Sequence, residues 1–267
     1  MTSTTVQADK LLNGSSLTLH GYDSDTPLAD RYDSSDSSSD RDRSPSPNGR
    51  HVTKEILGDV EIALWQDLSG GCGGKTWEAA YVMINYMLWK QQEDLSHSFL
   101  DNKTILDIGS GTGLVGLAVA KACPSLAHME LTDQIPMMPL LQDNIKLNYL
   151  ESKVGASVLN WGEPHDHKVD IVFASDCVYL EVAFQPLIDT LVTLTTNNKD
   201  VQIYMSYRKR RKADKRFFIL LKKQFRVIDI LDDPERPVYS RKGLHLYRLE
   251  RKTLPAIMKI SSPSLLR

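Results

Sequence analysis

The stretch Leu106-Asp107-Ile108-Gly109-Ser110-Gly111-Thr112-Gly113-Leu114-Val115-Gly116 joins an apolar run, 104–108, to a helix-like segment, 114–122. Its glycines stand at alternate positions, where they permit positive φ and let the backbone approach a ligand closely. A strand, a tight turn and a helix N-terminus in this order form an arrangement that holds a nucleotide-like ligand. Asp107, at the end of the strand, adds an acceptor-only carboxylate that suits a ligand carrying donors or positive charge.

The glycine turn alone leaves the cofactor open. Residues 111–116 match G-x-G-x-x-G, and Asp133 follows Gly113 at the spacing of about 20 residues typical of dinucleotide-binding proteins. Asp133 ends a second apolar segment, 127–132, where it could grip two ribose hydroxyls. An NAD-dependent oxidoreductase and a methyltransferase both need that grip. A turn that only connects strand to helix is a third reading, but it does not require the carboxylate.

Composition indicates a globular protein of the reducing cytoplasm. The 267 residues are 41% hydrophobic and 25% charged, with a net charge of −2. No apolar stretch approaches the roughly 20 residues of a membrane span, and the N-terminus lacks a secretory pattern. The three cysteines (72, 123 and 177) are scattered without metal-ligand spacing, which predicts no metal site. We therefore expect a cytoplasmic protein, with nuclear presence left open.

The chain divides into a folded region and two tails. Residues 1–50 are rich in Ser and Asp and have too few apolar side chains to offset the entropy of ordering, so they are predicted to be disordered. The folded domain is predicted at 51–253, and a C-terminal tail at 254–267. The domain begins with a strand at 60–65, a glycine-rich loop at 69–74 and a helix at about 77–90.

From residue 104 onward, strand and helix signals alternate, which predicts an α/β, Rossmann-like parallel sheet with helices on both faces. The last two strands are joined by 232–243 without a predicted helix, so they are expected to pair antiparallel. The predicted strands are 104–109, 127–132, 154–159, 169–175, 201–207, 225–231 and 244–250, and the predicted helices are 114–122, 136–148 and 181–196.

The end of the fourth of these strands carries a second group of polar residues, Ser175, Asp176 and Tyr179. Ligands of open α/β sheets bind outside the carboxyl ends of the strands, where the strand order reverses. The first and fourth strands flank that point, so Asp107 is expected to share one crevice with this group. The alternative is that Asp176 only caps the next helix and Tyr179 only packs.

At this point the chain resembles the seven-strand lysine methyltransferases of the methyltransferase family 16 type, which use S-adenosylmethionine and modify non-histone proteins. The resemblance runs from about Val60 to Leu249. The segments that carry it are 74–80, the glycine turn, Leu131-Thr132-Asp133, Asn160-Trp161-Gly162 and Asp176-Cys177-Val178-Tyr179. Two positions differ from many relatives: Ser175 replaces alanine, and Asp107 replaces glutamate.

The resemblance implies the class I methyltransferase sheet, S-adenosylmethionine as methyl donor and S-adenosylhomocysteine as product. Asp133 would take the ribose hydroxyls, Trp161 would enclose the adenine, and Trp77 would close over the methionine end. Asp176 and Tyr179 are the predicted catalytic residues, which would hold the substrate amine. The predicted cofactor-binding residues are Trp77, Asp107, Gly109, Ser110, Gly111, Gly113, Asp133, Trp161 and Ser175.

The substrate is predicted to be a protein lysine. Methyltransferases that act on amide or adenine nitrogens resemble one another in an Asn/Asp-Pro-Pro-Tyr turn, and here Cys177-Val178 replaces the prolines. The basic run 208–216 has no interleaved aromatic platform, so it reads as a solvated helix or a contact for an acidic protein surface, and nucleic acid is not expected. Within the family, elongation factor 1A is favoured as the target, with Hsp70-type chaperones as the alternative.

Other classes stay open at this level. An RNA or small-molecule methyltransferase would share the donor site, and a non-catalytic scaffold could bind partners through its surface. The intact glycine turn, Asp133 and Asp176 speak against the scaffold. The protein is expected to be a monomer.

Overall fold

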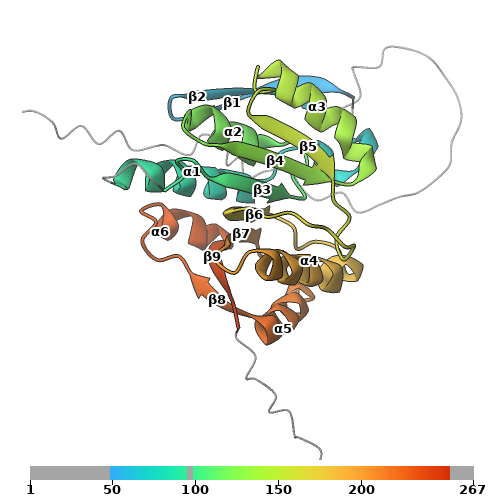
Figure 1. The fold of residues 1–267 in the computed structure, drawn as a ribbon, viewed down its shortest axis with the longest axis vertical. Coiled ribbons are helices and arrows are strands. Elements are labelled where there is room, and N and C mark those ends of the chain that lie inside the picture. Colours follow the sequence, from blue (N-terminus) through green and yellow to red (C-terminus); the bar gives the residue numbers. More distant parts are fainter. Residues whose placement is uncertain (1–48, 95–98, 253–267) are drawn as a thin grey trace, which may run out of the picture. The chain divides into compact units, whose positions relative to one another are not determined.

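The structure, a computed structural model, describes residues 49–94 and 99–252. The tails predicted at 1–50 and 254–267 therefore lie outside the described residues, except for 49 and 50. The centre of the domain is a seven-stranded sheet with the order β5-β4-β3-β6-β7-β9-β8 (Figure 1). Its strands are β3 Thr104–Ile108, β4 His128–Asp133, β5 Val154–Val158, β6 Ile171–Ser175, β7 Gln202–Arg208, β8 Phe225–Asp229 and β9 Leu244–Arg251.

Helices cover both faces of this sheet. From β3 the chain crosses to β4 and β5 through α2 and α3, and from β6 it crosses to β7 in the opposite direction through α4. Right-handed crossovers in opposite directions put their helices on opposite faces of the sheet. α1 packs on α2, and α5 packs on α4, so α1, α2 and α3 share one face and α4 and α5 the other. Figure 1 shows α4 beside α5. The helices are α1 Glu78–Glu93, α2 Leu114–Ala122, α3 Met138–Leu147, α4 Phe184–Asn197, α5 Asp214–Gln224 and α6 Arg236–Tyr239. Short 3₁₀ turns lie at Leu68–Gly70, Cys72–Gly74, Ile135–Met137, Glu181–Ala183 and Ser240–Lys242.

The predicted fold class is confirmed, including the parallel pairing of β3 with β6 and the antiparallel pair β8–β9. Three elements were not predicted. A strand β1, His51–Leu57, pairs with β2, Val60–Gln66, in a separate hairpin. Its apolar side chains Val52 and Ile56 are exposed, which hides the alternation expected of a half-buried strand.

The other two are helices. The reading of 208–216 as a solvated helix holds only for its last three residues, 214–216, which begin α5, and the rest of α5 was not predicted. α5 buries only Phe217, Leu221 and its first residue, Asp214, between exposed basic side chains, so its apolar signal is weak. The prediction that 232–243 contains no helix is wrong, because α6 forms one turn there with a proline near its start. No helix within the described ranges is long and apolar enough to cross a bilayer.

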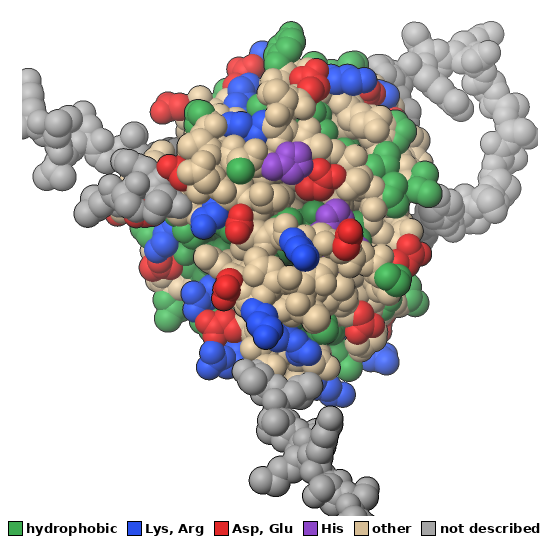
Figure 2. All heavy atoms as spheres, in the orientation of Figure 1, with side chains coloured by type: hydrophobic (Ala, Val, Ile, Leu, Met, Phe, Trp, Pro, Cys, Tyr) green, Lys and Arg blue, Asp and Glu red, His purple; other side chains and the backbone are tan. Residues whose placement is uncertain are grey.

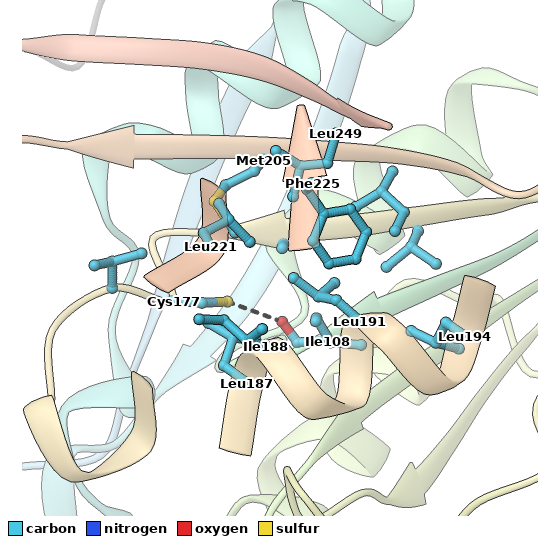
Figure 3. Close-up of a cluster of buried hydrophobic side chains, with 14 of the residues drawn as sticks. Ile108, Cys177, Leu187, Ile188, Leu191, Leu194, Met205, Leu221, Phe225 and Leu249 are labelled. Carbon is cyan, nitrogen blue, oxygen red and sulfur yellow. Dashed lines mark hydrogen bonds between the residues drawn. The ribbon is translucent and has the colours of Figure 1, made fainter. Parts of the chain in front are cut away.

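The core that supports the site lies between the sheet and helices α4 and α5 (Figure 3). Leu187 and Leu191 of α4 pack in one buried cluster with strand residues such as Ile108 and Met205. Cys177 belongs to this cluster, and its thiol donates a hydrogen bond to the Ile108 carbonyl (3.2 Å). This bond joins the ends of β3 and β6, so the core holds the two strand tips together.

The β1–β2 hairpin is attached to the domain by two buried asparagines of the α3 region, which pair with the β2 backbone as a strand would. Asn148 accepts from the Ala63 amide (3.1 Å) and donates to its carbonyl (2.7 Å). Asn144 does the same with Trp65 (2.6 and 3.0 Å) and also donates to the Thr112 carbonyl (2.9 Å). The hairpin is thereby tied to the glycine turn.

Replacing Asn144 by alanine is expected to lower the free energy of unfolding by about 3 kcal/mol, because the buried Thr112 carbonyl and the part-buried amide and carbonyl of Trp65 lose their partner. Urea denaturation measures the change. Asn160→Ala is the matched control, since among the described contacts the Asn160 side chain donates only to the exposed Glu163 carboxylate, and it should change stability by less than about 0.5 kcal/mol. Equal effects of the two substitutions would contradict the assigned role of Asn144.

Candidate active site

The glycine turn between β3 and α2 has left-handed backbone at Gly109 (φ 64°) and Gly111 (φ 58°). A Cβ on Gly109 would stand 2.8 Å from Cζ2 of Trp161, and one on Gly111 would stand 2.7 Å from the Gly73 carbonyl oxygen. Both positions therefore need glycine for conformation and for space. The turn lies between the Trp161 ring and the glycine-rich loop that precedes α1.

Asp107 ends β3 beneath this turn and is almost wholly buried, with 1% of its surface exposed. Neither carboxyl oxygen has a hydrogen-bond partner among the residues that the structure describes. Burial, and then the nearby charge of Asp133, raise the pKa of the Asp107 carboxyl to about 8. A buried carboxyl without a partner marks a place where a ligand with donors or positive charge would be stabilised.

Asp133 at the end of β4 faces the same turn. Its Oδ2 accepts from the Gly111 amide (2.9 Å) and its Oδ1 accepts from the Gln134 amide (2.7 Å). Burial raises the pKa of this carboxyl above its ordinary value. A carboxylate has about four acceptor positions, so two remain for a pair of hydroxyls.

Trp161 follows β5 and is half-buried, with its ring against Gly109 and against the core below α4. The turn that carries it is fixed to α4, because the Gly162 amide donates to the Thr190 hydroxyl (2.8 Å). Ser110 sits within the glycine turn, where its hydroxyl donates to the Asp107 carbonyl (2.7 Å). Gly113 adopts φ 82° directly before α2.

Asp176 stands at the tip of β6 in a left-handed conformation (φ 55°), which is uncommon for a residue other than glycine. The next helical segments begin after Leu180 and Ala183, so Asp176 caps neither of them. The Arg210 guanidinium binds its carboxylate through two parallel hydrogen bonds, Nη1 to Oδ1 (2.7 Å) and Nη2 to Oδ2 (2.6 Å). Asp176 is therefore engaged in a bidentate ion pair.

Arg210 is the residue of this site that sequence reasoning missed. It lies in the basic run after β7, in which six other Lys and Arg residues are equally plausible partners for an acid. Its position two residues beyond the end of a strand was the available signal. The guanidinium also lies over the Trp77 ring, with Cζ 5.2 Å from the ring centroid.

Trp77 stands directly before α1, where it is the N-cap residue. Its ring contacts two cations, because Lys75 Nζ lies 4.2 Å from the ring centroid in addition to Arg210. The indole N–H donates to the Cys72 carbonyl (2.9 Å), which fastens the ring to the glycine-rich loop. The structure thus places Trp77 beside the Asp176–Arg210 pair.

Tyr179 and Ser175 complete the predicted set. Tyr179 is 44% exposed, and partial burial followed by the adjacent Cys72 thiol raise the pKa of its hydroxyl. The Ser175 hydroxyl bonds to that of Ser206 on β7 (3.0 Å).

The predicted carboxylates come together around the Cys177 thiol. Burial, and then the charges of Asp107, Asp176 and Asp133, raise the pKa of this thiol well above its ordinary value. β3 pairs with both β4 and β6, and Cys177, next to Asp176, bonds to the end of β3, so the three acids stand at the carboxyl ends of three neighbouring strands. The structure therefore places Asp107 and Asp176 at the same end of the sheet, where a cationic ligand would be favoured.

Comparison with known proteins gives consistent matches. A family described as lysine methyltransferase matches residues 57–224. The protein-lysine N-methyltransferase EFM6 of Saccharomyces cerevisiae is 39% identical over 74% of this chain and 94% of its own. The protein N-lysine methyltransferase METTL21A of Danio rerio is 30% identical over 72% of this chain and 84% of its own. Among solved structures, a T. thermophilus 16S rRNA methyltransferase aligns with a TM-score of 0.49 at 15% identity, over 78% of this chain and 52% of its own.

The buried Asp107 predicts a dependence of stability on pH. The unfolded chain releases this proton near pH 4 and the folded protein near pH 8, so the folded state binds more protons between these values. The free energy of unfolding should therefore fall as the pH rises through this window, and Asp107→Asn should remove part of that fall.

Urea denaturation of both proteins between about pH 5 and pH 8 measures the difference. Asp189→Asn, on the exposed surface of α4, is the control and should retain the wild-type dependence. Parallel curves for wild type and Asp107→Asn would mean that Asp107 is ionised in the folded protein.

Proposed function

Because this chain belongs to the lysine methyltransferase family, we propose that it transfers the methyl group of S-adenosylmethionine to a protein lysine beside Asp176. The observation that carries this proposal is the position of Asp107, Asp133 and Asp176 at the carboxyl ends of the neighbouring strands β3, β4 and β6, beside the glycine turn. Three carboxyls and two tryptophans at one end of the sheet suit a cationic donor and a lysine that enters as its ammonium form and loses a proton before it reacts.

The residues present fit S-adenosylmethionine. The glycine turn packs against the Gly73 loop without room for a Cβ at Gly111, so its backbone is exposed to close approach, and the unpartnered Asp107 carboxyl can receive donors from the ligand. The open acceptor positions of Asp133 suit the ribose hydroxyls, and Trp161 offers an aromatic wall for the adenine. When bound, the donor supplies a methyl carbon that is already activated by the sulfonium.

The protein must then present a neutral lysine amine in line with that carbon. A lysine has an ordinary pKa of about 10.4, and both desolvation and a nearby positive charge lower the pKa of an amine. In this proposal the Asp176 carboxylate holds the hydrogens of the amine and directs its lone pair. Tyr179, three residues further on, offers a hydroxyl at the edge of the same site.

For the target we propose elongation factor 1A, with an Hsp70-type chaperone as the alternative. The segments around Trp77 and the Asp176-to-Tyr179 turn resemble both branches of the family, so they support a protein lysine as acceptor, and the labelling assay below decides between the two targets. The run 208–216 adds positive charge beside the site, which suits an acidic protein surface. We expect a monomer acting in the cytoplasm.

Asp176→Asn is expected to reduce methylation at least about 100-fold, because the amide keeps the shape of the carboxylate but not its charge. Asparagine also tolerates the left-handed backbone at this position. The assay incubates the protein with radiolabelled S-adenosylmethionine and either elongation factor 1A or an Hsp70-type chaperone. Thermal unfolding checks that the variant is folded.

Asp200→Asn, exposed before β7, is the matched control and should label at the wild-type rate. Wild-type labelling by Asp176→Asn would refute the catalytic assignment. A parallel incubation with a cell lysate extends the test: labelling of another protein there, with neither candidate labelled, would change the target and leave the activity standing.

A further inference from the structure

The Arg210 guanidinium occupies the groups that a substrate ammonium would use. It covers both oxygens of Asp176 and lies over the Trp77 ring, while the Arg208 amide approaches Oδ1 at 3.5 Å. The Asp176 side chain is only 6% exposed and that of Arg210 25% exposed, so solvent screens this pair weakly. A carboxylate and an aromatic face are the two features that bind a cationic amine in a protein.

A lysine ammonium and the Arg210 guanidinium compete for Asp176 in this arrangement. The fork of the arginine takes one lone pair from each oxygen and the Arg208 amide approaches Oδ1, so about one acceptor position, on Oδ2, is left. Two cations beside one negative charge would also repel each other, and more strongly where the site is partly desolvated. Entry of a lysine to Asp176 therefore requires Arg210 to leave.

The fold lets the side chain leave while the backbone stays in place. The buried Asp214 carboxylate accepts from the amides of Arg210 (3.2 Å) and Arg211 (3.0 Å) and from the Tyr207 hydroxyl (2.9 Å). The segment between β7 and α5 is thus anchored at its own backbone. Rotation about the side-chain bonds of Arg210 is sufficient to clear Asp176.

Once displaced from Asp176, the Arg210 guanidinium has few carboxylates to bind among the described residues around the run 208–216. Around the basic run, Glu78 pairs with Arg208, Asp214 with Arg211, and Glu181 with Arg216 at 3.7 Å. The nearest neighbours in sequence include the exposed Lys209 and Lys212. Figure 2 shows Lys and Arg side chains gathered toward the end of the molecule where α5 and β8 lie in Figure 1. A carboxylate on the substrate would supply the missing partner.

We propose that Arg210 is an internal competitor for the place of the target lysine, and that it leaves Asp176 for an acidic side chain of the substrate next to that lysine. The inference rests on the proposed role of Asp176 and adds a requirement for the sequence around the target. Displacing Arg210 requires less free energy for a lysine with a neighbouring Asp or Glu than for a lysine flanked by neutral residues, because the guanidinium then gains a new carboxylate partner.

The first test needs no methyl transfer. Butylammonium, a model of the lysine side chain, is titrated by calorimetry against wild type, Arg210→Ala and the double variant Arg210→Ala/Asp176→Asn. Removal of the competitor should tighten binding about tenfold, as expected when only about a tenth of the wild-type molecules expose the site. The double variant should lose this gain.

Lys212→Ala is the matched control, because it removes a nearby exposed charge without touching Asp176. It should bind butylammonium as wild type does. Equal affinities of wild type and Arg210→Ala would overturn the proposal.

The second test uses the reaction, with a peptide that carries glutamate next to its lysine and a counterpart that carries glutamine there. Wild type should prefer the glutamate peptide through a lower KM, and Arg210→Ala should lose most of that preference and accept the glutamine peptide better. A fall in kcat at unchanged KM, restored by added methylguanidinium, would show instead that Arg210 positions Asp176, and would also overturn the proposal. If wild type methylates no protein or peptide, the proposed function fails, and the butylammonium titration still decides the role of Arg210.

Discussion

The parallel pairing of β3 with β6 determines where every polar group of the site can stand. The chain leaves β3 toward β4 and leaves β6 toward β7, so the strand order reverses between them, which is where open α/β sheets bind their ligands. The hydrogen bond from Cys177 to the Ile108 carbonyl joins the two strand tips at this point. Asp107 and Asp176, far apart in the sequence, therefore share one edge of the sheet.

The acids gathered at this edge are accommodated in different ways. Asp107 is buried without a partner, which favours its neutral form, and Asp133 is held by two backbone amides. Asp176 is balanced by Arg210. In each case a ligand that carries positive charge or a hydroxyl group can give the carboxyl a better partner. The acids that lower the stability of the free protein therefore favour the binding of donor and acceptor.

Much of this was accessible from the sequence, because strand ends are marked by abrupt changes from apolar to polar residues. The glycine turn, Asp133 and the Asp176 turn were placed by that pattern, and the structure brings them together. Arg210 was not, since the choice among several basic residues depends on a side-chain rotamer and on the anchoring by Asp214. β1 and α5 were not predicted because few of their side chains are buried, so the apolar residues in their sequences show only a weak strand or helix periodicity. The roles of the site residues toward ligands remain predictions.

A crystal structure of the protein with S-adenosylhomocysteine is the strongest single test of this account. It should show the ribose hydroxyls on the Asp133 carboxylate, the adenine against Trp161 and the sulfur at the tips of β3 and β6, facing Asp176. Binding of the ligand at another edge of the sheet, or a sulfur turned away from Asp176, would contradict it.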